Sequence, residues 1–178
     1  FDSGADDVPI LLLPGSRREE IERLLPPMLG AAERLGAADP ARRFFQPGAG
    51  GVDEERIRAH LAASAAEVTL THDARYALMG LARAAMATSG TVVMEAALMG
   101  LPAVVLYRMS ALSYLIGRLL VDVPRFSLPN ILLGETFETE LLQGAVQPDR
   151  IAAEMEKIIA DGAERRYVTE RLPRAAER

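Results

Sequence analysis

The sequence predicts an α/β fold with a doubly wound parallel sheet, and two observations lead to this prediction. Short apolar runs of strand length alternate along the chain with longer segments whose apolar residues recur at helical spacing. The first run, residues 9–13, is apolar throughout, which is typical of a strand buried on both faces of a parallel sheet. Such an alternation of strands and helices requires right-handed crossover connections and helices on both faces of the sheet.

The same pattern gives the individual elements. The predicted strands are residues 9–13, 43–46, 67–71, 84–87 and 102–107. The predicted helices are residues 18–35, 53–63, 73–82, 90–99, 111–121, 149–160 and 163–175, and residues 127–130 are expected to be irregular. Asp53 and Asp73 are the expected N-caps of two helices, and Gly100 is the expected left-handed residue after a third. Pro26 and Pro27 are expected to kink or restart the first helix.

Length and composition exclude several classes of protein. A chain of 178 residues is expected to form one domain, here residues 9–162, preceded by linker-like residues 1–8. It contains no cysteine, so disulfides and thiolate metal sites are excluded, and its two histidines suggest no metal centre. The net charge of −5 argues against a nucleic-acid surface. We find no membrane-spanning run and no signal peptide, and because the chain opens on Phe1 we interpret it as a piece of a longer protein.

The most informative segment is the junction between the fourth strand and its helix. Ser89, Gly90 and Thr91 form a turn of small residues at the start of a helix, where free backbone N–H groups and the helix dipole favour an anion. Glu95 lies one helical turn further on, where a carboxylate can accept hydrogen bonds from sugar hydroxyls. Phosphate and ribose together indicate a nucleotide. The alternative is an ordinary capped helix with a solvated Glu95.

A second junction of this kind follows the first strand. Gly15 and Ser16 open the first helix, and Arg17 is placed to hold a diphosphate with two parallel hydrogen bonds. The alternative for Arg17 is a surface ion pair with Glu20 or Glu22. Because ligands of open α/β sheets bind at the carboxyl ends of the strands, two such turns in one chain favour a shared site.

Three common motifs are missing from the sequence. The turn after the first strand has neither the G-x-G-x-x-G of dinucleotide-binding folds nor the G-x-x-x-x-G-K of P-loop proteins, and no G-x-S-x-G nucleophile motif occurs. The chemistry that remains is group transfer, in which binding and positioning of the substrates dominate.

Five short motifs occur in an order that closely resembles the lipid-A-disaccharide synthase family. They are LLPGSR at 12–17, TSGT at 88–91 followed by EAAL at 95–98, YRM at 107–109, SLPN at 127–130 and ELLQ at 140–143. The resemblance covers residues 9–160. It implies the C-terminal, nucleotide-sugar half of a GT-B glycosyltransferase, in which two Rossmann-like domains face each other across a cleft.

The resemblance also implies roles for particular residues. The 15–17 and 89–91 turns would hold the diphosphate of UDP-2,3-diacylglucosamine, and Glu95 would hold the ribose. Arg17 and Asn130 match positions that the family uses for activity, so both are expected to lie on exposed turns at the cleft and to activate the sugar donor. Independently of the resemblance, Arg108 at the end of the fifth strand is expected to face the cleft, because ligands bind at strand ends, and to neutralise leaving-group charge, with an ion pair to Glu95 or Glu140 as the alternative.

Further expectations concern the sugar, the acceptor and the membrane. Glu140 and Gln143 are expected to hold sugar hydroxyls, or else to begin a helix with a solvated face. The acceptor, 2,3-diacylglucosamine 1-phosphate, and the general base would be held by a missing N-terminal half, and residues 163–178 are expected to form a C-terminal helix that packs on that half. The apolar segment 111–121 is either core or a peripheral contact with the cytoplasmic face of the inner membrane. No cofactor is implied, and oligomerisation is left open.

Two other classes of function stay open at this point. One is a different UDP-sugar enzyme of the GT-B type, either a muramyl-pathway N-acetylglucosaminyltransferase or a UDP-sugar 2-epimerase, although the motifs at 127–130 and 140–143 disfavour both. The other is a nucleotide-binding module without chemistry of its own.

Overall fold

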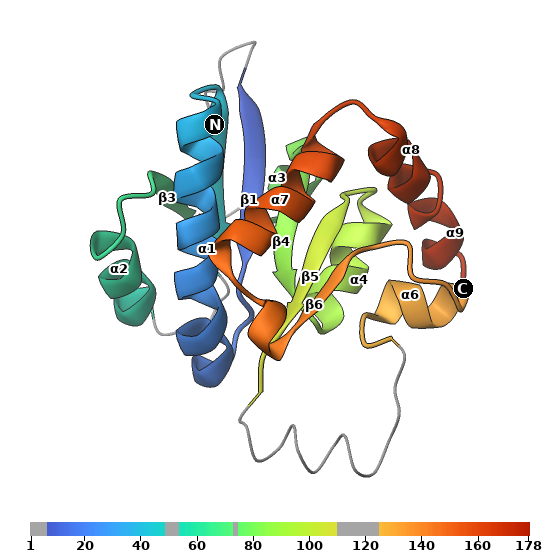
Figure 1. Ribbon diagram of the computed structural model, residues 1–178. Helices are drawn as coiled ribbons and strands as arrows, with labels where there is room; N and C mark the ends of the chain where they lie inside the picture. Colours follow the sequence, from blue (N-terminus) through green and yellow to red (C-terminus); the bar gives the residue numbers. More distant parts are fainter. Residues whose placement is uncertain (1–6, 49–53, 73–74, 110–124) are drawn as a thin grey trace.

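The chain forms one six-stranded parallel sheet with helices on both faces (Figure 1). This computed structural model describes residues 7–48, 54–72, 75–109 and 125–178. The strands are β1 (Val8–Leu13), β2 (Arg42–Pro47), β3 (Val68–Thr71), β4 (Ala84–Thr88), β5 (Ala103–Tyr107) and β6 (Glu140–Leu142). They lie in the order β3-β2-β1-β4-β5-β6, and each pairs in parallel with its neighbours. The predicted fold class is therefore confirmed.

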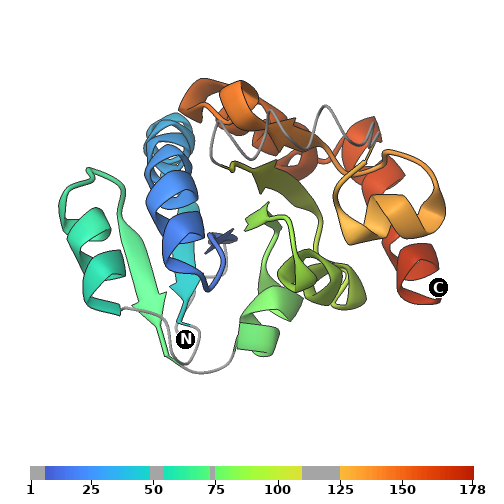
Figure 2. The ribbon, with the colours of Figure 1, turned by 90° about the horizontal axis from the view of Figure 1, so that it is seen from below.

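The helices alternate with the strands along the chain. They are α1 (Arg18–Ala38), α2 (Glu54–Ala62), α3 (Arg75–Leu81), α4 (Thr91–Leu98), α6 (Leu128–Leu133), α7 (Pro148–Ile159), α8 (Ala163–Thr169) and α9 (Leu172–Ala176), with a 3₁₀ turn at Gln143–Ala145. Helices α1 and α7 lie side by side on one face of the sheet, and α3 and α4 cover the other (Figure 2). Within the described ranges, none of the helices combines the length and the apolar character that crossing a bilayer requires.

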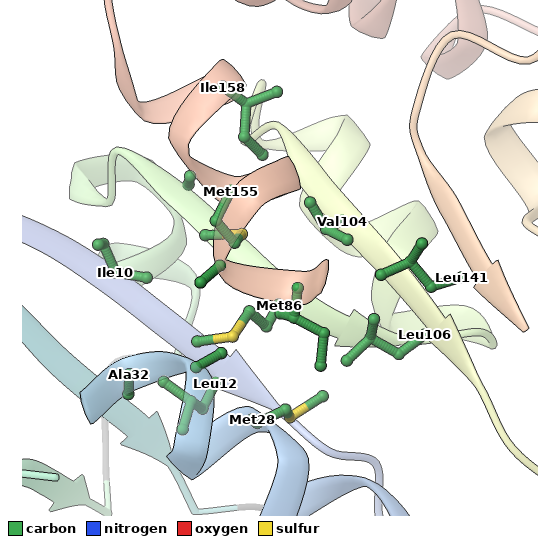
Figure 3. Close-up of a cluster of buried hydrophobic side chains, with 14 of the residues drawn as sticks. Ile10, Leu12, Met28, Ala32, Met86, Val104, Leu106, Leu141, Met155 and Ile158 are labelled. Atoms are coloured by element: carbon green, nitrogen blue, oxygen red, sulfur yellow. The ribbon is translucent and has the colours of Figure 1, made fainter. Parts of the chain in front are cut away.

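Alternation of side chains along the central strands divides the core into two clusters. Ile10 and Leu12 of β1 pack with Met86 of β4, Met28 of α1 and Met155 of α7 on one face (Figure 3). The intervening strand residues point to the opposite face. There they pack against buried side chains of α3 and α4. Strands buried on both faces explain why β1 reads as an uninterrupted apolar run.

The five predicted strands and most of the predicted helices are confirmed to within a few residues. Gly100 has the expected positive φ, +69°. The expected N-caps Asp53 and Asp73 and the apolar segment 111–121 lie outside the described residues.

Three sequence expectations were wrong. Residues 127–130 are not irregular, because Ser127 caps α6 by accepting a hydrogen bond from the Asn130 N–H. The sixth strand was missed. A single helix over 163–175 is instead two, with Pro173 in the first turn of α9. Helix α1 continues through Pro26 and Pro27, so it does not restart there, and the alternative of a kink stays a prediction.

Helix α9 contacts α4 and α6. Its expected packing against another domain stays a prediction.

Candidate functional site

A cavity of about 300 Å³ lies at the carboxyl ends of β1, β2 and β4. The strands finish at the lower end of Figure 1, which faces the viewer in Figure 2. Seven of the ten residues expected to bind the nucleotide sugar line this cavity: Gly15, Ser16, Arg17, Ser89, Gly90, Thr91 and Glu95. The volume is at the lower end of the range of small-molecule sites. The two turns that the sequence singled out are thus brought together.

The first turn requires glycine. Gly15 has a φ of +99°, and a Cβ at this position would overlap the carboxylate of Glu20 and lie 3.0 Å from Cγ2 of Thr88. Glu20 in turn accepts a hydrogen bond of 3.2 Å from the Arg17 N–H, which caps the start of α1. The ends of β1 and β4 therefore approach each other closely across this turn.

Arg17 stands at the rim of the cavity. Its Nη1 lies 3.3 Å from Oε1 of Glu20, the ion pair that the sequence offered as the alternative, and 84% of its side chain is exposed. An exposed pair of this kind contributes little to stability. The guanidinium therefore remains accessible to a ligand at the cavity mouth.

The second turn differs in part from the expectation. The Ser89 hydroxyl donates a 2.8 Å hydrogen bond to the Phe126 carbonyl, so its proton is not available to a phosphate. Gly90 is the N-cap residue of α4, and no side chain from the described part of the chain caps the helix there. The first N–H groups of α4 are left for a ligand or for water.

Glu95 is held by an arginine that the sequence analysis missed. Arg75, the first residue of α3, donates from Nη2 to Oε2 of Glu95, and both residues line the cavity. The ion pair of Glu95 with Arg108 that was considered as an alternative is not formed.

Arg108 instead hydrogen-bonds to backbone oxygens. It donates to the carbonyl of Val146 at 3.1 Å and to the carbonyl of Arg23 at 3.4 Å. The alternative ion pair with Glu140 is likewise not formed, and Arg108 is not one of the described residues that line the cavity. Its expected effect on leaving-group charge stays a prediction.

Asn130 is fully buried, so its expected exposed position at the cleft was wrong. Its Nδ2 donates to the Glu138 carbonyl at 2.9 Å and to Oε1 of Glu140 at 2.7 Å, and its Oδ1 accepts from the N–H groups of Phe137 and Glu138. This side chain ties α6 to β6. Residues 127–130 were expected to be a loop because the sequence alone reveals neither the hydrogen bond with which Ser127 caps α6 nor the contacts of the Asn130 amide with the segment that leads into β6.

Glu140 and Gln143 also hold backbone segments in place. Glu140 accepts hydrogen bonds from the N–H groups of Phe126 and Ser127 at 3.1 and 3.0 Å. Gln143 has a φ of +50°, and its amide accepts from the Met109 N–H and donates to the Met109 carbonyl at 2.9 and 3.2 Å. Neither begins an α-helix. Their expected contacts with sugar hydroxyls stay predictions.

Gln46 is a second cavity residue that the sequence analysis missed. It stands near the end of β2, is 1% exposed, and its Oε1 has no hydrogen-bond partner among the described residues. A polar residue that follows two phenylalanines at the end of a strand was the available signal, because ligands gather where parallel strands end.

Glu138 is buried beside this network. Its Oε1 accepts a 3.1 Å hydrogen bond from the Ala103 N–H, while Oε2 has no partner in the described ranges. Burial raises the pKa of Glu138 to about 8, the charge of Glu140 adds to the rise, and the Ala103 hydrogen bond opposes it.

Across the residues that the structure describes, we find no group of three or more His, Asp or Glu side chains that could hold a metal ion.

The sheet order and the position of the cavity define the class of protein, a Rossmann-like α/β domain, and this domain matches solved GT-B glycosyltransferase and epimerase structures over about 40% of their chains. The crystal structure of WaaG, a glycosyltransferase involved in lipopolysaccharide biosynthesis, matches 98% of this chain and 44% of its own chain, with a TM-score of 0.66 and 14% identity. A UDP-GlcNAc 2-epimerase from Neisseria meningitidis, determined bound to UDP-GlcNAc, matches 96% of this chain and 40% of its own, with a TM-score of 0.56 and 15% identity. At such identities the matches show the fold alone.

Sequence comparison identifies the family. The model of the lipid-A-disaccharide synthetase family matches residues 4–177, and the chain therefore belongs to the lipid-A-disaccharide synthase family of glycosyltransferases. It is 45% identical over 157 residues to the lipid-A-disaccharide synthase of Anaeromyxobacter dehalogenans, covering 88% of this chain and 41% of that protein. The corresponding enzyme of Syntrophus aciditrophicus is 42% identical over 183 residues, covering 97% of this chain and 48% of that protein. The chain thus spans less than half the length of these relatives.

Proposed function

We propose that this chain is the nucleotide-sugar half of a lipid-A-disaccharide synthase and that its cavity binds the UDP of UDP-2,3-diacylglucosamine. One observation carries the proposal: two small-residue turns, at 15–17 and 89–91, and Glu95 line one cavity at the carboxyl ends of the strands. The family membership supports the choice of substrate, because the complete enzyme would transfer diacylglucosamine to 2,3-diacylglucosamine 1-phosphate with a β-1,6 linkage.

Each part of the cavity has a proposed role. The free N–H groups at the start of α4, together with Thr91 and Ser16, bind the diphosphate, since the end of a helix offers both hydrogen-bond donors and positive potential. Glu95 accepts hydrogen bonds from the ribose hydroxyls through Oε1. Arg17 at the rim activates the sugar donor by stabilising the departing UDP.

This division of labour leaves two tasks to the rest of the protein. An inverting displacement needs a base on the acceptor hydroxyl, a positioned anomeric carbon and stabilisation of the leaving group. The proposed site supplies the last two. We assign the general base and the lipid acceptor to a preceding domain, and we expect the acylated substrates to bring the enzyme to the cytoplasmic face of the inner membrane.

Calorimetry with the 178-residue chain tests the proposal. We expect UDP to bind in the presence of a chelator, because the diphosphate is held by N–H groups and arginine rather than by a metal ion. ADP should give no measurable heat. Equal binding of ADP would contradict the assigned base specificity, and binding of neither nucleotide would contradict the site.

A further inference from the structure

Arg75 forms part of the wall of the cavity. Its side chain is 31% exposed and that of Glu95 is 23% exposed, so their ion pair is largely shielded from solvent. The guanidinium carbon lies 5.2 Å from the centroid of the Tyr76 ring, and Nη2 lies 3.3 Å from the Tyr76 hydroxyl. Arg75 is thus fixed by contacts on two sides.

The two carboxylate oxygens of Glu95 differ in their hydrogen bonds. Arg75 engages Oε2, whereas Oε1 accepts no hydrogen bond from any described residue. A half-buried carboxylate without a partner would be costly, and an arginine on one oxygen removes most of that cost. It also restricts rotation of the Glu95 side chain, because the guanidinium itself is held by Tyr76. Oε1 is therefore kept in place at the cavity, without a hydrogen-bond partner in the part of the chain that the structure describes.

We propose that Arg75 is the positioning residue of this site: it holds Glu95 so that Oε1 faces the hydroxyls of a bound nucleoside. The inference rests on the proposed binding of UDP. Arg75 acts through Glu95 rather than on the phosphates, since the start of α4 and Arg17 already supply hydrogen-bond donors for the diphosphate. Its loss should then affect ligands with and without phosphates by the same factor.

The experiment compares UDP with uridine on four forms of the chain: the parent, R75M, E95Q and the double variant. We expect R75M to weaken binding of both ligands about tenfold, the scale of one charge-assisted hydrogen bond. In the E95Q background the same substitution should cost nothing further. UDP is measured by calorimetry and uridine by ligand-observed NMR, and R75K, which keeps the charge, should restore part of the affinity for both.

The chain offers a matched control. Arg171 lies over the ring of Tyr167 at 3.5 Å and pairs with Glu135 at 3.1 Å, which repeats the arrangement of arginine, tyrosine and glutamate away from the cavity. R171M should leave both affinities unchanged. Thermal unfolding of all variants separates a loss of binding from a loss of fold.

Several results would overturn the inference. A loss confined to UDP would make Arg75 a phosphate contact, and an undiminished loss in the E95Q background would show that it does not act through Glu95. If R75M fails to fold, R75K decides, because a lysine that binds both ligands as the parent does would exclude a role for the fixed guanidinium. A parent that binds neither ligand would contradict the proposed function, and this inference with it.

Discussion

At the scale of single residues, the structure separates motif residues that line the cavity from motif residues that hold the fold. Arg17 and Glu95 belong to the first group, and Asn130 belongs to the second. Asn130 uses its donors and its acceptor within the protein, as buried amides generally do. A loss of activity on mutating Asn130 would therefore not by itself identify a group that touches substrate.

We predict that Asn130→Ala lowers the free energy of unfolding by about 2–4 kcal/mol, because it leaves the N–H groups of Phe137 and Glu138 without their buried partner. Urea unfolding followed by circular dichroism measures the change. Gln147→Ala, at an exposed position whose side chain does not cap α7, is the control and should stay within about 0.5 kcal/mol. Parent-like stability of the Asn130 variant would contradict the structural role.

We predict that Glu95→Gln weakens UDP binding by about 1.5–3 kcal/mol, as expected for a hydrogen bond to a charged group. If the contact is to the ribose, 2′-deoxyuridine diphosphate should bind poorly to the parent and lose less on mutation. Calorimetry measures both ligands. Glu135→Gln removes a similar arginine-paired carboxylate far from the cavity and should have no effect. Equal losses for the two nucleotides would show that Glu95 acts elsewhere.

At the scale of elements, the sequence predicted best what is long, periodic or buried on both sides. Strand β1 and helices α1 and α7 were recognisable because their apolar patterns extend over several residues or turns. Strand β6 has three residues and helix α6 has six, too few for either period to be visible. Their positions depend on tertiary contacts of Asn130 and Glu140, which local sequence does not encode.

The candidate site shows the same difference between local and tertiary features. Both small-residue turns could be predicted because glycine and hydroxyl residues at strand ends follow from local rules. The partner of Glu95 could not, since Arg75 precedes it by 20 residues and reaches it only through the packing of α3 beside α4. Long-range ion pairs of this kind are set by topology.

Glu138, in the segment before β6, should make the stability of the chain depend on pH. The pKa of Glu138 is raised from 4.5 to about 8, so the folded chain binds more protons than the unfolded chain between these values. Stability should therefore fall as the pH rises from about 5 to 8, and the loss should be on the order of 3 to 4 kcal/mol. Glu138→Gln, which cannot ionise, should remove this contribution.

Urea unfolding at several pH values measures the difference between the parent and Glu138→Gln. Glu170→Gln, at an exposed position, should keep the slope of the parent. A variant that shows the parent's slope between pH 5 and 8 would contradict the assignment of a neutral Glu138 in the folded chain.

At the scale of the whole molecule, the parallel sheet brings functional groups from distant parts of the chain together at the carboxyl ends of its strands. The cavity is formed by the ends of β1, β2 and β4 with the starts of α1, α3 and α4, so it depends on the complete order of the sheet. Two arginines and two glutamates line the cavity, so their charges cancel. An anion would therefore be attracted by the oriented N–H groups rather than by a net positive charge of the cavity. Such a cavity can hold and orient one substrate. Catalysis between two substrates needs a second surface facing it.

We therefore predict that the 178-residue chain binds UDP but forms no disaccharide. The assay combines labelled UDP-2,3-diacylglucosamine with 2,3-diacylglucosamine 1-phosphate, and the full-length synthase of Syntrophus aciditrophicus serves as the positive control under the same conditions. Product should stay at the level of the blank, because the acceptor and the base that deprotonates its hydroxyl are assigned to another domain, and their correct placement contributes several orders of magnitude to the rate. Turnover by the chain alone would mean that the general base lies within these residues. The division of labour between two domains would then be wrong, even if UDP binds in the cavity as proposed.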